Sequence, residues 1–193
     1  MVTLQTLLWQ SLVFAGVALA LALFISRFPG LRRAYDALVD LLAGLFLSAG
    51  LGVVLVSVFM RYVLNNPPDW GDEFARIFVA WGAMFGFSVA LREGRHITVD
   101  LLYSFLPPGG KRALDFLSRA IGVLFSAFIT VAGWHYVMFL KTLGLRSIYT
   151  DIPEWILTFI LPLGFFFFTL QFALSLFDLM RGEAAVAEGV SGV

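Results

Sequence analysis

The sequence contains no cysteine among its 193 residues. This absence excludes disulfide bonds, thiolate zinc sites, iron–sulfur clusters and cysteine nucleophiles. Charge is also scarce, since only 13% of the residues are charged, against about a quarter in an ordinary soluble domain. Thirteen basic residues balance thirteen acidic ones, and a net charge of zero argues against a nucleic-acid-binding protein that works by bulk positive charge.

Apolar residues are correspondingly abundant. They make up 60% of the chain, and 21 Phe, five Trp and five Tyr exclude an acidic disordered protein. A helix needs about 20 mostly apolar residues to cross the hydrocarbon core of a bilayer. Five runs approach or exceed this length, so we expect an all-α integral membrane protein with about five transmembrane helices, at residues 4–26, 38–60, 74–91, 113–140 and 155–180.

The chain divides into three parts by composition. Residues 1–34 are expected to form a transmembrane helix and a basic loop, residues 35–181 a membrane unit of four helices, and residues 182–193 a polar, disordered tail. The first helix has no basic residue before Arg27. A cleaved signal peptide begins with a basic region, so we favour a retained helix.

Orientation follows from the basic residues in the short loops. With the N-terminus outside, nine of the thirteen fall on the inner side (Arg27, Arg32, Arg33, Arg92, Arg95, Lys111, Arg112, Arg119 and Arg181) and four on the outer side (Arg61, Arg76, Lys141 and Arg146). This asymmetry predicts a periplasmic N-terminus and a cytoplasmic C-terminus. Residues 96–106 have the pattern of a short amphipathic helix on the cytoplasmic membrane surface, with Arg95, His96 and Asp100 as its polar residues.

Small residues recur at a spacing of four in three of the predicted helices. Lipid gives no hydrophobic drive for helix association, so close contact depends on such residues. They can serve packing within the chain or contact with a partner membrane protein, and both readings stay open. The candidate packing residues are Gly44, Ser48, Gly52, Gly82, Gly86, Gly122, Ser126 and the helix-bending Pro162.

Ionisable residues are almost absent from the predicted membrane interior, where catalytic and carrier proteins usually hold them. His135 is the one such residue away from a helix end, and we interpret it as a hydrogen-bond partner between helices. His96 lies at the other membrane side, so the two cannot share a haem. No metal-protease, serine-hydrolase or phosphate-loop motif occurs, and we expect no catalytic residue, no metal and no cofactor in this chain.

Polar residues instead gather at the predicted outer edge. Acidic residues at a helix start complement its dipole, and tryptophans suit the membrane interface. These effects do not account for two arginines beside the carboxylates, an array that suits contact with another protein. The candidate docking residues are Arg61, Trp70, Asp72, Glu73, Arg76, Trp81, Pro153 and Trp155.

The order of these elements resembles the small membrane subunit, the DctQ-type or Q subunit, of tripartite ATP-independent periplasmic (TRAP) transporters. The resemblance covers about residues 38 to 181. It rests on Arg61-Tyr62, a Trp70-x-Asp72-Glu73 element where the family usually has W-x-E-E, Trp81 and Gly86, Arg92-x-Gly94-x-His96-Ile97-x-Val99-Asp100, Leu106-Pro107, Ile152-Pro153-x-Trp155 and Pro162-Leu163-Gly164. The first helix is additional to the usual four.

The resemblance implies a role without catalysis. The small subunit would scaffold a large, elevator-type DctM subunit in the bacterial inner membrane and help a periplasmic DctP-type binding protein to dock. The system would take up an organic acid with sodium ions, which are expected in the large subunit. Membrane lipid is the remaining partner, and no nucleic acid is expected. An anchor subunit of a respiratory enzyme and a stand-alone carrier are the alternatives.

Overall fold

The computed structural model describes residues 3–93 and 108–181, and this part of the chain is almost entirely helical. The predicted interfacial helix with Arg95, His96 and Asp100 and the polar tail lie outside it. The helices are α1 (Leu4–Arg27), α2 (Pro29–Tyr62), α3 (Gly71–Arg92), α5 (Pro108–Leu143), α6 (Glu154–Thr158) and α7 (Ile160–Arg181). Five candidate membrane spans result, with α6 and α7 forming the fifth, and the expected all-α membrane architecture is confirmed.

The basic loop predicted after the first helix is wrong. Only Phe28 separates α1 from α2, because Pro29 occupies the first position of α2, where its fixed φ angle suits a helix and its missing N–H costs no hydrogen bond. Arg32 and Arg33 are consequently helical. At about 1.5 Å per residue, the 34 residues of α2 extend well beyond the hydrocarbon core of about 30 Å.

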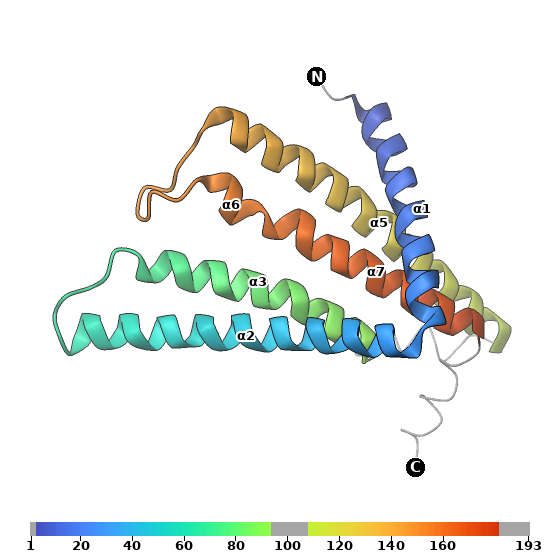
Figure 1. Ribbon diagram of the computed structural model, residues 1–193, viewed down its shortest axis with the longest axis horizontal. Coiled ribbons are helices and arrows are strands. Elements are labelled where there is room, and N and C mark those ends of the chain that lie inside the picture. The colour runs from blue at the N-terminus through green and yellow to red at the C-terminus, as the bar shows by residue number, and fades with distance from the viewer. Residues whose placement is uncertain (1–2, 94–107, 182–193) are drawn as a thin grey trace, which may run out of the picture.

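The helices form two antiparallel pairs joined by a third contact. α2 packs on α3, α5 packs on α7, and α3 lies against α7 to unite the pairs. In Figure 1, α2 and α3 run near the long axis of the molecule, α5 and α7 run side by side at an incline to α2, and α1 crosses steeply at one end. α1 rests mainly on α5 and α7.

Glycines set the closest helix approaches. A Cβ atom on Gly82 would lie 2.6 Å from Leu47 Cγ, one on Gly122 would lie 2.5 Å from Phe172 Cε1, and one on Gly164 would lie 2.8 Å from Met84 Cβ. These glycines join α3 to α2, α5 to α7 and α7 to α3. Ser126 is fully buried beside the second contact and donates to the carbonyl of Gly122 over 2.6 Å.

Other small residues face away from the chain. Gly44, Ser48 and Gly52 lie on the exposed side of α2, and a Cβ atom on either glycine would meet nothing within 4 Å. Gly86 likewise has open space around it. These four residues therefore do not bring helices of this chain together.

The last predicted helix is interrupted. α6 ends at Thr158 and α7 begins at Ile160, with Phe159 between them. Pro162 cannot donate a backbone hydrogen bond to the carbonyl four residues earlier, and that carbonyl belongs to Thr158. The buried Pro162 therefore favours a new helix start rather than a bend in one continuous helix.

Candidate partner-docking surface

Glu73 lies in the first turn of α3, yet only 4% of its surface is exposed. Its Oε2 accepts a hydrogen bond of 2.9 Å from Thr150 Oγ1, in the loop between α5 and α6. A buried carboxylate needs such a donor, because burial removes its hydration. Glu73 therefore ties the start of α3 to a loop 77 residues further along the chain.

Arg61 and Asp72 come together as a pair at the same end of the molecule. The distance from Arg61 Nη2 to Asp72 Oδ2 is 3.3 Å, and both side chains are well exposed. An exposed pair of this kind contributes about 0–1 kcal/mol to stability. Arg76, one turn along α3 from Asp72, is also exposed, and it forms no ion pair within the described part of the chain.

The α5–α6 loop forms the facing wall. Arg146 Nη1 contacts Asp151 Oδ2 at 2.9 Å, and an antiparallel bridge pairs Arg146 with Pro153. Pro153 then precedes the first turn of α6. The Lys141 ammonium lies 5.5 Å from the centre of the Trp155 ring, which braces the end of α5 against α6.

These elements enclose a pocket of about 420 Å³ between the start of α3, the α5–α6 loop and α6. Its polar wall comes from Glu73, Arg76, Arg146, Tyr149 and Glu154. Both signs of charge are present, and neither Arg76 nor Glu154 forms an ion pair within residues 3–93 and 108–181, so both remain for an incoming partner. The pocket suits a polar side chain or loop of another protein better than an apolar ligand.

The predicted tryptophans are divided between this surface and the interior. Trp81 lines the pocket, but its ring is half-buried and packs 5.2 Å from the Phe46 ring of α2. Trp70 stands before α3 as a half-exposed ring in edge contact with Phe74. Trp81 therefore joins α2 to α3 as well as bordering the pocket.

The structure brings no three His, Asp or Glu side chains together as a metal site in the described ranges 3–93 and 108–181. His135 instead forms a bond of 2.7 Å between its Nε2 atom and Gln10 Oε1. The bond links α5 to α1, in accord with its interpretation as a partner between helices.

Comparison with known proteins decides the family. Residues 50–182 match the model of the DctQ component of tripartite ATP-independent periplasmic transporters. The chain belongs to the DctQ family. The match begins inside α2 and ends just after α7, so α1 and the first half of α2 precede it.

Individual relatives of this DctQ-family chain support the same family assignment. It is 30% identical to the ectoine TRAP transporter small permease protein TeaB of Halomonas elongata, over 76% of the chain and 78% of the relative. The sialic acid TRAP transporter small permease protein SiaQ of Vibrio cholerae is 26% identical over 83% and 92%. Part of the sialic acid TRAP transporter permease protein SiaT of Haemophilus influenzae is 30% identical, over 37% of this chain and 12% of that protein.

The opposite end of this DctQ-type bundle holds ion pairs that the sequence did not indicate. Both Arg32 nitrogens contact the two carboxylate oxygens of Asp178, with 2.7 Å from Nη1 to Oδ1. Arg92 lies 2.6 Å from Asp40 and 3.4 Å from Asp36. The first pair joins α2 to α7, and the second joins α3 to α2.

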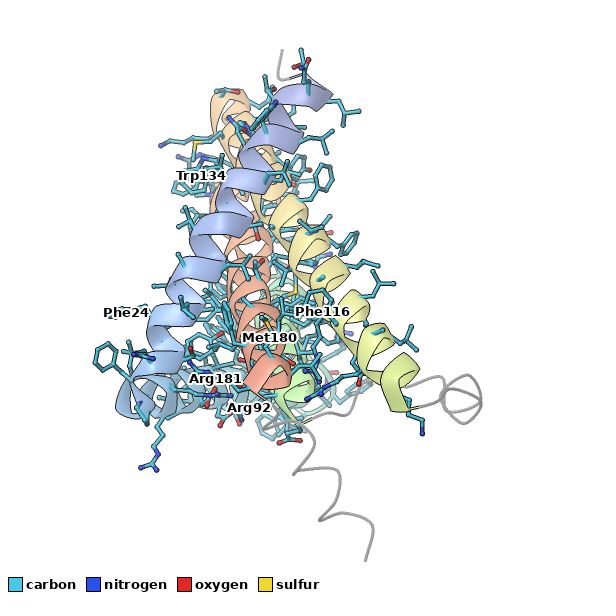
Figure 2. All side chains as sticks on the ribbon, turned by 90° about the vertical axis from the view of Figure 1, so that its right-hand side faces the viewer. Phe24, Arg92, Phe116, Trp134, Met180 and Arg181 are labelled. Atoms are coloured by element: carbon cyan, nitrogen blue, oxygen red, sulfur yellow. The ribbon has the colours of Figure 1, made fainter. Side chains whose placement is uncertain are left out.

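Arginines at this end also satisfy helix carbonyls. Arg181 donates from Nη1 to the Ser26 carbonyl at 3.2 Å, and Arg119 donates to the Ser175 carbonyl at 2.8 Å. Figure 2 looks onto this end and shows Arg92 and Arg181 close to the tip of α7. The last four carbonyls of a helix lack partners within it, so Arg181 caps the end of α1 at Ser26. Ser175 lies further inside α7, so the bond from Arg119 is an additional link between α5 and α7.

Proposed function

We propose that this chain is the static scaffold of a TRAP transporter in the bacterial inner membrane. It holds a large, elevator-type DctM subunit and helps a DctP-type binding protein to dock on the periplasmic side. The complex takes up an organic acid with sodium ions, which the large subunit binds. The chain itself carries out no catalysis.

The docking role rests on one observation, the outer pocket with Arg76 at its rim. Glu73 fixes the start of α3 to the facing loop, so the pocket is held in shape before a partner arrives. A preformed site reduces the ordering cost of binding. The exposed guanidinium of Arg76 can form a charge-assisted hydrogen bond with a partner carboxylate.

The scaffold role is supported by α2. This long helix packs on α3 and only slightly on α1, and its free side carries Gly44, Ser48 and Gly52. Small residues allow another membrane helix to approach closely. We propose that the large subunit packs on this side of α2.

The test of docking is uptake by proteoliposomes that contain both membrane subunits, with the binding protein and a sodium gradient supplied. Arg76→Ala should lower the apparent affinity for the binding protein on the order of tenfold, the effect of one lost charged hydrogen bond. Arg33→Ala, an exposed arginine of the opposite end, is the matched control. Equal affinities for the two variants would refute the docking role of Arg76.

The respiratory-anchor alternative is not favoured by the family match. An anchor would co-purify with a redox subunit, whereas a TRAP scaffold should recover a large multi-span permease. Affinity purification from native membranes separates the two.

A further inference from the structure

A second cavity lies beside the N-terminal half of α1, the helix that crosses the others steeply in Figure 1. It is a groove of about 640 Å³ between α1, α5 and the start of α7. The walls are formed by twelve residues, among them Val13 and Val17 of α1, Val131 and Trp134 of α5, and Phe166 of α7. Trp134 appears beside the upper half of α1 in Figure 2.

The groove exists because α1 uses small residues for contact. Ala15, Ala18 and Ala22 are buried where α1 meets its neighbours, while Val13 and Val17, on another side of the same helix, remain 61% exposed. The short valine side chains leave space beside the contacts that Gln10 and Phe14 of α1 make with α5 and α7.

Three polar side chains of the groove form hydrogen bonds within the chain. Gln10 and His135 bond to each other across one end at 2.7 Å, and Thr130 Oγ1 donates to the Ser126 carbonyl at 2.9 Å. No charged residue lines the groove. A charged organic acid would lose its hydration there without a compensating cation, so the groove favours an uncharged, mainly apolar occupant.

We propose that this groove binds one acyl chain of a membrane phospholipid. Its volume falls within the range of about 300–1,000 Å³ that encloses small ligands. From Gln10 to Val17 it extends about 10 Å along α1, at about 1.5 Å per residue. One leaflet is half of a hydrocarbon core of about 30 Å, so this length covers roughly two thirds of the thickness of a leaflet.

The headgroup has a matching position. Lys141 follows Trp134 by seven residues, or two helical turns, so the two residues share one face of α5. The ammonium lies 5.5 Å from the centre of the Trp155 ring, four residues before the groove residue Phe159, and it can also meet a lipid phosphate there. Charge complementarity therefore favours a phospholipid over a neutral lipid.

The position of the groove argues against the large subunit as its occupant. One wall is α1, which precedes the family match at residues 50–182. A contact with the large subunit that the whole family shares would therefore not depend on α1. The inference is independent of the proposed docking role, because it concerns this chain and lipid alone.

The first test counts phospholipid that stays with the full-length chain after detergent purification, by native mass spectrometry. Wild type should retain one phospholipid per chain. Val17→Phe fills the groove from an exposed position, so the fold is preserved, and retention should fall on the order of tenfold. Val56→Phe, at an exposed valine of α2 outside the groove, is the matched control and should retain lipid like wild type. Lys141→Gln should weaken retention of phospholipid and leave that of diacylglycerol unchanged.

The second test identifies the occupant in native membranes that contain the whole transporter. A photo-crosslinking amino acid at position 17 should give an adduct with the mass of a phospholipid. An adduct with the large subunit, or with a second copy of this chain, would overturn the proposal. Equal lipid retention by Val17→Phe and Val56→Phe, or no retained lipid in wild type, would do the same.

Discussion

Glu73 joins the first turn of α3 to the α5–α6 loop through a single hydrogen bond with Thr150. Thr150→Val keeps the shape of the donor and removes its hydroxyl. Because Glu73 is buried, the lost bond should lower the free energy of unfolding by about 1–3 kcal/mol. Denaturant unfolding of the purified chain in detergent measures this change.

Thr142→Val serves as the control for that measurement. The Thr142 hydroxyl donates to the Phe139 carbonyl of its own helix and is exposed, so its loss should change the stability little. If Thr150→Val and Thr142→Val change the free energy of unfolding equally, the hydrogen bond from Thr150 to Glu73 does not stabilise the fold.

Arg32 and Asp178 form the second residue-scale link. The two parallel hydrogen bonds hold partly buried charges, so Asp178→Asn should cost about 1.5–3 kcal/mol. A double-mutant cycle with Arg32→Gln should show a coupling energy, because each change removes the same pair. Arg33→Gln in place of Arg32→Gln should give purely additive effects, and coupling to Arg33 instead would contradict the pairing.

Sequence reasoning placed these residues only in part. Asp72 and Glu73 stand out beside Arg61 because they are near in sequence and fall at a helix start. Asp178 and Thr150 carry no such signal, since their partners are 146 and 77 residues away. The charge count located the basic end of the bundle, but pairing depends on how the helices lie together.

The helices, too, could be predicted only in part from the sequence. Hydropathy located all five spans, because apolar length alone determines them. It did not show that α2 begins at Pro29 or that α7 restarts at Ile160, since both boundaries depend on proline. The spacing of small residues identified Gly82 and Gly44 equally, although only Gly82 contacts a neighbouring helix.

That difference between the glycines can be measured. Gly82→Leu forces a side chain into Leu47 and the backbone of α2, so the chain should lose about 1–3 kcal/mol of stability. Gly44→Leu meets open space and should leave the isolated chain as stable as wild type. Thermal unfolding in detergent compares the two, and similar losses would show that the exposed side of α2 is packed within the chain.

Gly44 should matter for association with the large subunit, although it should not matter for the stability of the isolated chain. If the large subunit packs on α2, Gly44→Leu should reduce its recovery in affinity purification several-fold, because a leucine keeps the helices apart. Leu45→Met, an adjacent exposed position with a volume-conserving change, is the control. Full recovery with Gly44→Leu would place the interface elsewhere.

At the scale of the whole molecule, the polar groups are held at two ends of an apolar bundle. Arginines join α2, α3, α5 and α7 at one end, and the outer pocket lies at the other. Such a molecule has no polar centre for ions or substrate in the part that the structure describes. This construction agrees with the proposal that the chain is a fixed support for a moving partner.

The absence of cysteine allows the predicted membrane orientation of the chain to be tested without a background thiol. Ile148→Cys lies in the α5–α6 loop, where Ile148 is 94% exposed, and Arg112→Cys lies at an exposed position near the start of α5. With nine basic residues on the inner side and four on the outer, the positive-inside rule places position 148 in the periplasm and position 112 in the cytoplasm. A membrane-impermeant maleimide should therefore label Ile148→Cys in intact spheroplasts and label Arg112→Cys only after the membrane is opened. The reverse pattern would invert the topology and put the outer pocket beyond the reach of any periplasmic protein.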